Sequence, residues 1–115
     1  MDLKATNRDI GSITVVDISG RITLGEGSAL LRGLVRQLLE HGRKNIVLNL
    51  SDVNYIDSSG IGELVSSFTA VKKEGGELKL LNLTKKVHDL LLITKLFTVF
   101  DVHTDEQKAI TSFRP

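Results

Sequence analysis

Residues 46–50 read Ile-Val-Leu-Asn-Leu, and this nearly continuous apolar run decides the fold. Such a run is typical of a parallel strand that is covered by other elements on both faces. A helical pattern follows it and should end at Gly75-Gly76, where glycine accepts a left-handed cap at little cost. The apolar residues that share one side of this helix are Ile61, Leu64, Val65, Phe68 and Val71. The two patterns together predict a strand followed by a helix, the repeating unit of an α/β domain.

Upstream of this unit the sequence predicts two strands and one helix. Residues 3–8 and 13–19 form an antiparallel pair, and Gly11 supplies the turn between them. The helix begins its apolar pattern at Leu30 and ends at Gly42. The apolar stripe consists of Leu30, Leu31, Leu34, Val35, Leu38 and Leu39. The residues on the opposite face, which we expect to be solvated, are Arg32, Arg36 and Glu40.

Downstream, residues 78–83 predict another strand and Thr84 caps a third helix, over residues 87–93. Residues 97–102 predict a last strand, and Thr104-Asp105-Glu106 opens a terminal helix that ends near Phe113. The run Leu90–Ile93 leaves at least one apolar side chain outside any single helical stripe. We favour a core position for it beneath the last strand, and an interface is the alternative.

Strands that alternate with helices predict right-handed crossovers between parallel neighbours. The opening hairpin adds one antiparallel strand at the N-terminus. We therefore expect one α/β domain over residues 1–115, with a mixed but mostly parallel sheet. No linker, repeat or low-complexity tract interrupts the 115 residues.

Composition excludes several classes of function. The sequence has no cysteine, which removes disulfides, thiolate nucleophiles and cysteine zinc sites and favours a reducing cytoplasm. The net charge of +1 gives no basic field for nucleic acid, and one tyrosine and four phenylalanines offer few rings to stack on bases. The longest apolar run, Leu90–Ile93, is far too short to insert in a membrane, and the first residues do not resemble a signal peptide.

The most distinctive local feature is the segment Tyr55-Ile56-Asp57-Ser58-Ser59-Gly60-Ile61-Gly62, between the central strand and the helix that follows. Free N–H groups at a helix N-terminus favour carboxylate and hydroxyl caps, and they also accept a phosphate. Capping alone could explain the three polar residues Asp57, Ser58 and Ser59. The segment is therefore either a plain helix start or a site of modification.

The helix that begins here has an unusual face. Opposite its apolar stripe it carries small residues, although Gly or Ser inside a helix costs roughly 0.5–1 kcal/mol relative to Ala. A smooth surface of this kind suits the docking of a partner, and packing beneath a loop of the same chain is the alternative. The residues on this face are Ser59, Gly62, Ser66 and Ala70, with Glu63 and Lys73 beside them.

The order and spacing of these segments resemble the anti-anti-sigma branch of the STAS domain family over nearly the whole chain. The resemblance is carried by Leu48-Asn49-Leu50, by the segment 55–62, by Gly75-Gly76-Glu77-Leu78 and by Leu96-Phe97. It implies a βα superhelix with an extra N-terminal strand, and a protein that is not an enzyme and has no cofactor or metal.

The resemblance also implies a switch. The first serine of the family's Asp-Ser-Ser-Gly motif, which corresponds to Ser58, is phosphorylated by a serine kinase that is also an anti-sigma factor. The unphosphorylated protein binds that anti-sigma factor and frees sigma. A metal-dependent serine phosphatase resets the phosphorylated form. The partner-binding residues would be Asp57, Ser59, Gly60, Gly62, Glu63 and Ser66.

One segment departs from the family. After the second strand many members carry Gly-Glu-Leu-Asp, a segment implicated in partner contact, whereas this chain reads Gly20-Arg21-Ile22-Thr23. An arginine thus replaces an acid, and either Glu26 supplies the acidic group or the partner has a different surface.

Other functions have less support in the sequence. His41, His88 and His103 lie on separate elements without a spaced carboxylate or second histidine, which argues against a metal triad or a catalytic relay. Gly25-Glu26-Gly27 matches the first part of the Gly-x-Gly-x-x-Gly fingerprint of dinucleotide-binding proteins. The third glycine is missing, because position 30 is leucine. An accessory subunit of a membrane lipid transporter and a stressosome-type scaffold remain the alternatives within the family, and a small enzyme lacks convergent catalytic groups.

Overall fold

The computed structural model describes residues 3–113, and its centre is strand β3 (Asn45–Ile56). This strand contains the apolar run 46–50 and continues six residues beyond it, to Ile56. Strands β2 (Ile13–Ile22) and β4 (Glu77–Leu81) pair with β3 on either side, both in parallel. The predicted central parallel strand is therefore confirmed.

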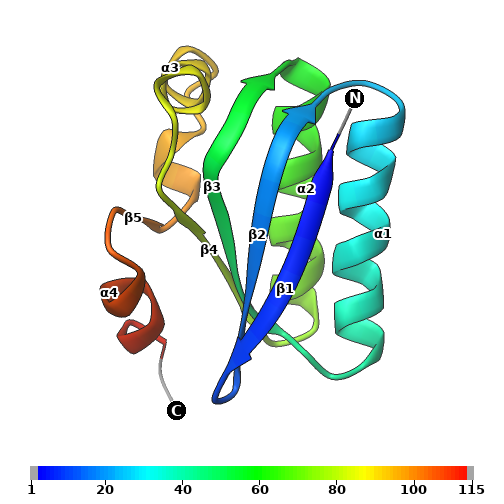
Figure 1. The fold of residues 1–115 in the computed structure, drawn as a ribbon, viewed down its shortest axis with the longest axis vertical. Helices are drawn as coiled ribbons and strands as arrows, with labels where there is room; N and C mark the ends of the chain where they lie inside the picture. The colour runs from blue at the N-terminus through cyan, green and yellow to red at the C-terminus, as the bar shows by residue number, and fades with distance from the viewer. Residues whose placement is uncertain (1–2, 114–115) are drawn as a thin grey trace.

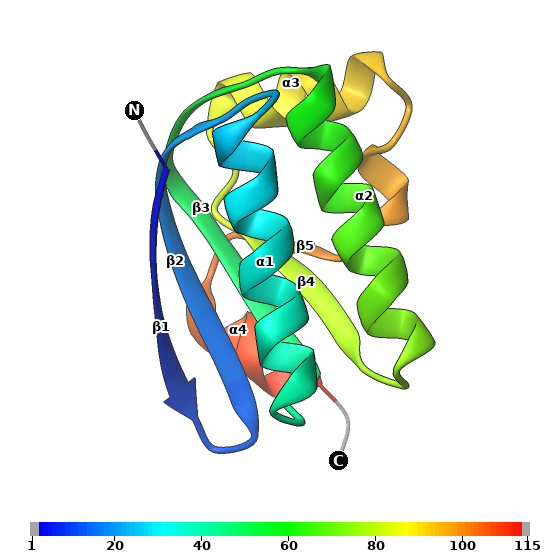
Figure 2. The same ribbon diagram turned by 90° about the vertical axis from the view of Figure 1, so that its right-hand side faces the viewer.

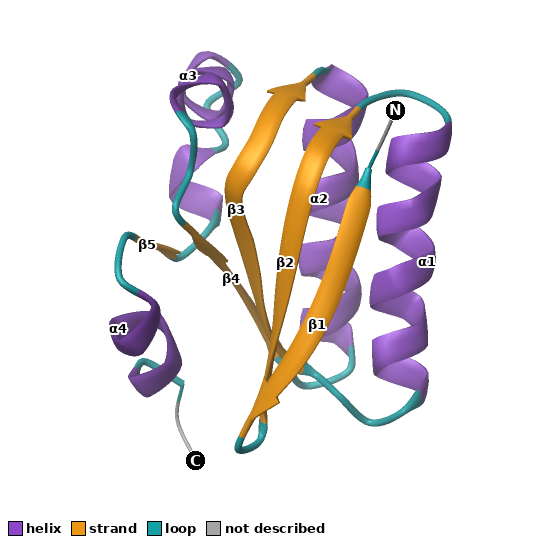
Figure 3. Ribbon diagram, in the orientation of Figure 1, coloured by secondary structure: helices purple, strands orange, loops and turns teal. Residues whose placement is uncertain are grey.

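The sheet has five strands, in the order β1-β2-β3-β4-β5 (Figure 3). Strand β1 (Lys4–Ile10) runs antiparallel to β2, and Gly11, with φ of +63°, turns the chain between them. Strand β5 (Val102–His103) closes the other edge in parallel with β4. The mixed, mostly parallel sheet with an N-terminal antiparallel strand matches the predicted fold class.

Two long helices cover one face of the sheet (Figures 1 and 2). They are α1 (Glu26–Glu40) and α2 (Ser58–Lys73), and α3 (Lys85–Ile93) lies across the end of the sheet near the start of α2. The main core lies beneath these helices. Its fully buried large side chains include Ile18, Ile22, Leu31, Ile46, Leu48, Leu50, Ile56, Leu64, Leu78, Leu80 and Leu91.

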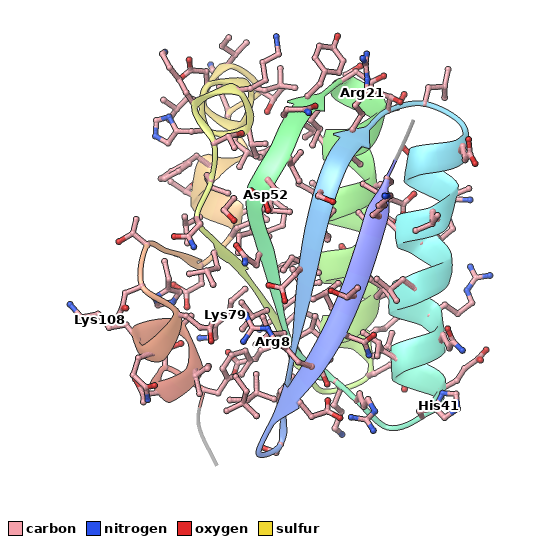
Figure 4. All side chains as sticks on the ribbon, in the orientation of Figure 1. Arg8, Arg21, His41, Asp52, Lys79 and Lys108 are labelled. Atoms are coloured by element: carbon pink, nitrogen blue, oxygen red, sulfur yellow. The ribbon has the colours of Figure 1, made fainter. Side chains whose placement is uncertain are left out.

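Helix α4 (Glu106–Thr111) covers part of the opposite face and encloses a smaller core (Figure 1). Arg8 ties it to the hairpin: its guanidinium donates to Asp17 at 2.7 and 3.1 Å and to Glu106 at 2.9 and 2.6 Å. Buried Lys79 donates to Asp101 at 2.8 Å and lies 4.8 Å from the centre of the Phe113 ring. Figure 4 shows Arg8 and Lys79 between the sheet and α4. The smaller core contains Ile13, Val15, Val47, Leu81 and Ala109.

The strand predicted over residues 97–102 is wrong for most of its length. Residues Phe97–Val99 form a 3₁₀ turn, and only Val102 reaches the sheet. Phe97 packs edge-on against His88, with 5.1 Å between ring centroids, and Phe100 packs against Phe68 at 5.4 Å. Two aromatic side chains three positions apart face the same core in a helical turn, whereas residues an odd number apart point to opposite faces of a strand.

Three further expectations need correction. Helix α1 begins at Glu26, before the first leucine of its stripe. The cap of α4 is Asp105, which accepts the Lys108 N–H at 3.2 Å, and not the Thr104 hydroxyl. At the end of α3, Leu92 and Ile93 are 50% and 75% exposed, so the favoured core position is wrong for both residues. The Thr84 cap of α3 is confirmed by a 3.4 Å bond from the Val87 N–H.

Candidate functional site

The segment 55–62 lies where β3 ends and α2 begins, at the carboxyl end of the parallel strands. Asp57 is the N-cap of α2: one carboxylate oxygen accepts the Gly60 N–H at 2.9 Å. The other oxygen accepts the Leu24 N–H at 3.1 Å, from the loop that follows β2. A backbone bond of 3.3 Å from the Asp57 N–H to the Ile22 carbonyl adds a third link. Asp57 therefore joins the start of α2 to the neighbouring loop.

Asp57 remains ionised in this position. Burial of the carboxyl group raises its pKa, but the N–H groups of Gly60, Leu24 and Ser59 act together against burial and bring the pKa below its usual value. Hydrogen bonds to the charged form are the physical cause. The helix thus begins with a fixed negative charge directly before Ser58.

Ser58 is the first residue of α2, and its side chain is exposed. The three histidines hydrogen-bond elsewhere: His41 with the Gln37 carbonyl, and His88 and His103 with their neighbours Asp89 and Asp101. Within residues 3–113 no group of His, Asp and Glu side chains is placed to hold a metal ion. The described residues thus give the Ser58 hydroxyl no histidine base, and its exposure makes it accessible to another protein.

Gly60 fixes the position of this helix start. A methyl group on it would lie 2.1 Å from the Ile22 carbonyl oxygen and 2.7 Å from the Ile56 side chain. The helix can approach β2 this closely only with glycine at this position. Gly62, one half-turn later, has open space around it.

The smooth face of α2 is only partly free. Ser59 is half-buried, while Gly62 and Ser66 are exposed, as a docking surface requires. Glu63 differs, since it is 6% exposed and accepts from Arg32 of α1 at 2.9 and 3.1 Å. Glu63 therefore packs within the chain, against helix α1 and not beneath a loop, and Arg32 is an ion-pair partner as well as a surface residue.

Farther along, Ser66 and Ala70 border a groove between α1 and α2. Its volume is about 420 Å³, and its walls carry charges of both signs. The charged residues that line it are Arg32, Arg36, Glu40, Glu63, Lys73 and Glu74. The groove leads away from Ser58 along the outer helical layer.

At this end of the sheet the structure brings together residues whose contacts were not predicted from the sequence. Arg21 and Tyr55 face each other in the β2–β3 ladder, and the Arg21 guanidinium lies 4.8 Å from the centre of the Tyr55 ring. The Lys86 ammonium lies 5.0 Å from the same ring. Leu24 is 78% exposed beside Asp57. The rule that sites form at the carboxyl ends of parallel strands would have found them, once β2 and β3 were paired.

Comparison with known proteins gives consistent results. The sequence profile of the STAS domain family matches residues 4–109. The chain is 36% identical over 110 residues to the "Anti-sigma-B factor antagonist" of Bacillus subtilis, which covers 96% of this chain and 95% of that protein.

Two solved structures share the fold. An anti-sigma factor antagonist from Mycobacterium paratuberculosis superposes with a TM-score of 0.83 at 20% identity, over 99% of this chain and 96% of that one. The Bacillus cell fate determinant SpoIIAA in its phosphorylated form gives a TM-score of 0.74 at 18% identity, over 96% and 100%. At these identities the likeness shows a common fold.

Proposed function

The chain belongs to the STAS domain family, and from this premise we propose that it is an anti-sigma factor antagonist controlled by phosphorylation of Ser58. In its unphosphorylated form it binds a serine-kinase anti-sigma factor in the cytoplasm and releases the sigma factor. The kinase phosphorylates Ser58, and a metal-dependent serine phosphatase restores the active form.

The observation that carries this proposal is the position of Ser58. Its hydroxyl is exposed at the first residue of a long helix, next to an aspartate whose two oxygens are already occupied. A helix N-terminus accommodates a phosphate, so modification there is compatible with the fold. The described helices are all too short or too polar to cross a bilayer.

The partner-binding surface consists of half-buried Ser59 and of the exposed residues around Ser58. Ser59, Gly62 and Ser66 present small side chains that a partner can approach closely. Asp57 and Gly60 hold the start of α2 in place beneath them, and Glu63 keeps α2 against α1. No cofactor takes part in this binding function.

Phosphorylation would act on binding far more than on stability. A phosphate adds about −1.5 to −2 charges, and the helix N-terminus stabilises a negative charge by ~0.3–1 kcal/mol. Repulsion from Asp57 acts in the opposite direction, so that the two effects largely cancel within the monomer. At a docked surface, a partner that fits a neutral serine must desolvate a dianion, which costs several kcal/mol.

Identification of the partner tests this proposal. We expect the wild-type protein and Ser58→Ala, used as baits in the source cell, to recover an anti-sigma factor with a serine-kinase fold. Ser59→Ala keeps a small side chain in the partner-binding surface, so it is the matched control and should recover the same partner. Recovery of transporter subunits in place of a kinase would overturn the proposal.

The site of modification is tested with the same kinase. With ATP it should add one phosphate to wild type and to Ser59→Ala, and none to Ser58→Ala. Phosphopeptide mapping by mass spectrometry locates the group. Modification found only on Ser59 would refute the assignment.

A further inference from the structure

Two positively charged side chains lie close to one aromatic ring, at the same end of the sheet as Ser58. The Arg21 guanidinium and the Lys86 ammonium lie 4.8 and 5.0 Å from the centre of the Tyr55 ring. Both cations are exposed and Tyr55 is half-buried. We call these three residues the cationic cradle. Figure 4 shows Arg21 at the end of β2, far from Arg8 and Lys79.

The cradle is close to Ser58 along the backbone. Arg21 and Tyr55 are partners in the β2–β3 ladder, and the next pair is Ile22 with Ile56. The following N–H, that of Asp57, donates to the Ile22 carbonyl at 3.3 Å, and Ser58 comes directly after it. The cradle therefore lies at the same end of the sheet as Ser58, within reach of a partner large enough to cover this end.

Within residues 3–113 no acidic side chain forms an ion pair with either cation of the cradle. Asp57 uses its oxygens for the N–H groups of Gly60 and Leu24, and Asp89 of α3 is paired with Lys85 at 2.6 Å. Both cations are exposed and lie close to the Tyr55 ring, which attracts a cation without cancelling its charge.

We propose that the cationic cradle is a docking site for an acidic segment of the partner protein. Charge complementarity supports this choice, because carboxylates can pair with both cations while the ring keeps them in place. The inference rests on the proposed function for the identity of the partner as an anti-sigma factor. The sign of the partner's charge follows from the cradle alone.

An acidic partner segment bound at the cradle would be repelled by a phosphate on Ser58. A partner segment rich in carboxylates is drawn to Arg21 and Lys86, and a dianion on the adjacent helix start repels it. The two cations attract the acidic segment, and the phosphate repels that same segment. This explains how one phosphate can displace a partner without a change in the fold.

The first test uses a probe that does not depend on the partner. We would titrate ¹⁵N-labelled protein with a deca-glutamate peptide and follow the amide signals by NMR at low and at physiological salt. Shifts should concentrate at Arg21, Tyr55 and Lys86 and weaken as salt is added. Arg21→Gln/Lys86→Gln should bind the peptide at least about threefold more weakly.

Matched variants separate the cradle from net charge. Lys72→Gln/Lys73→Gln removes two positive charges at the far end of α2, where Lys72 lies 6.0 Å from the centre of the Phe68 ring, and should bind like wild type. Shifts that map elsewhere, or equal weakening by the two double variants, would overturn the proposal.

The second test uses the anti-sigma factor itself. The Arg21→Gln/Lys86→Gln protein should bind it about three- to tenfold more weakly, with a reduced dependence on salt. Unchanged affinity would remove the cradle from the interface and leave the Ser58 switch intact. If wild type binds no anti-sigma factor, the proposed function is wrong, and the peptide titration still decides whether the cradle receives acidic segments.

Discussion

At Gly60 a single missing side chain determines where a helix begins. The residue is buried where α2 approaches β2, and its N–H donates to the Asp57 carboxylate at 2.9 Å. Backbone atoms occupy the space that a Cβ would need. Because a backbone cannot rotate away as a flexible side chain can, any larger residue must displace the helix start.

Gly60→Ala should therefore lower the free energy of unfolding by about 2–3 kcal/mol. The added methyl group would lie 2.1 Å from the Ile22 carbonyl oxygen. Gly62→Ala is the control in the same helix, where nothing lies within 4 Å, and it should raise stability by up to ~1 kcal/mol. Urea unfolding measures both. Equal effects from the two variants would show that the contact with β2 does not matter.

For single residues, the sequence predicts the role of a side chain better than it predicts contacts between distant elements. A carboxylate at Asp57 is a sufficient signal for a cap, and the structure confirms a cap there, whereas the hydroxyl of Ser59 does not cap the helix. The close approach of Gly60 to Ile22 was not predicted, because it depends on how two elements 38 positions apart pack together.

Between elements, one ion pair joins the two outer helices. Glu63 of α2 is 6% exposed and binds Arg32 of α1, whose side chain is 53% exposed. The Arg32 guanidinium therefore supplies much of the stabilisation that the buried Glu63 carboxylate needs in place of water. Removal of that guanidinium leaves a buried charge that only water at the edge of the groove can reach.

Arg32→Leu should cost about 1 kcal/mol of unfolding free energy, a value kept low because the guanidinium is half exposed to solvent. Arg36→Leu, one helical turn later on the same helix, removes a cation that forms no ion pair within the described residues and should have little effect. Glu63→Gln in the Arg32→Leu background should recover part of the loss. Chemical denaturation of the four proteins checks the set.

The attachment of α4 should depend on pH. Hydrogen bonds from Arg8 hold the pKa of Asp17 below 3.8 and that of Glu106 below 4.5, their usual values. Both pKa values are lower in the folded than in the unfolded chain, so the unfolded chain binds more protons at acid pH. The stability that these carboxylates add is present above about pH 5 and is lost as pH falls through their folded pKa values.

Glu106→Gln should therefore flatten the fall in stability between about pH 5 and pH 3, by less than ~1 kcal/mol because these side chains are screened by solvent. Glu40→Gln, which removes a carboxylate from the exposed end of α1, is the control and should keep the wild-type slope. Urea unfolding at several pH values gives the comparison. An unchanged slope in Glu106→Gln would mean that the Arg8 cluster does not stabilise the fold.

The elements differ in how well the sequence predicts them. Periodic apolar stripes predicted α1 and α2, because a stripe encodes both a period and a buried face. Helix α3 was predicted from its Thr84 cap and its apolar run. Residues 97–102 failed because their β-prone composition matches a strand, while Phe97 and Phe100 are in fact held by contacts with His88 and Phe68. Such contacts come from elements that a local pattern does not describe.

For the whole molecule, the position of Ser58 separates binding from stability. It lies at one end of the sheet, and the core under α4 lies on the opposite face. Because the Ser58 side chain is exposed, a charge on it lies in solvent and outside both cores. The arrangement permits a change of surface without a change of fold.

Ser58→Asp should reduce affinity for the anti-sigma factor by at least about tenfold, equivalent to ~1.4 kcal/mol. Its unfolding free energy should shift by less than ~1.5 kcal/mol. Changes in amide NMR signals should be confined to the ends of β2 and β3 and the start of α2. Calorimetric titration and urea unfolding measure the two energies. Normal binding, or binding lost only through unfolding, would contradict the switch.

The strand order has a consequence for synthesis on the ribosome. Each strand pairs with the strand next to it in sequence, from β1 to β5, so every newly emerged strand finds its partner already made. The bond between Arg8 and Glu106 is different, because it spans 98 positions. It can form only after Glu106 has left the ribosome, so the docking of α4 through Arg8 follows the synthesis of all five strands.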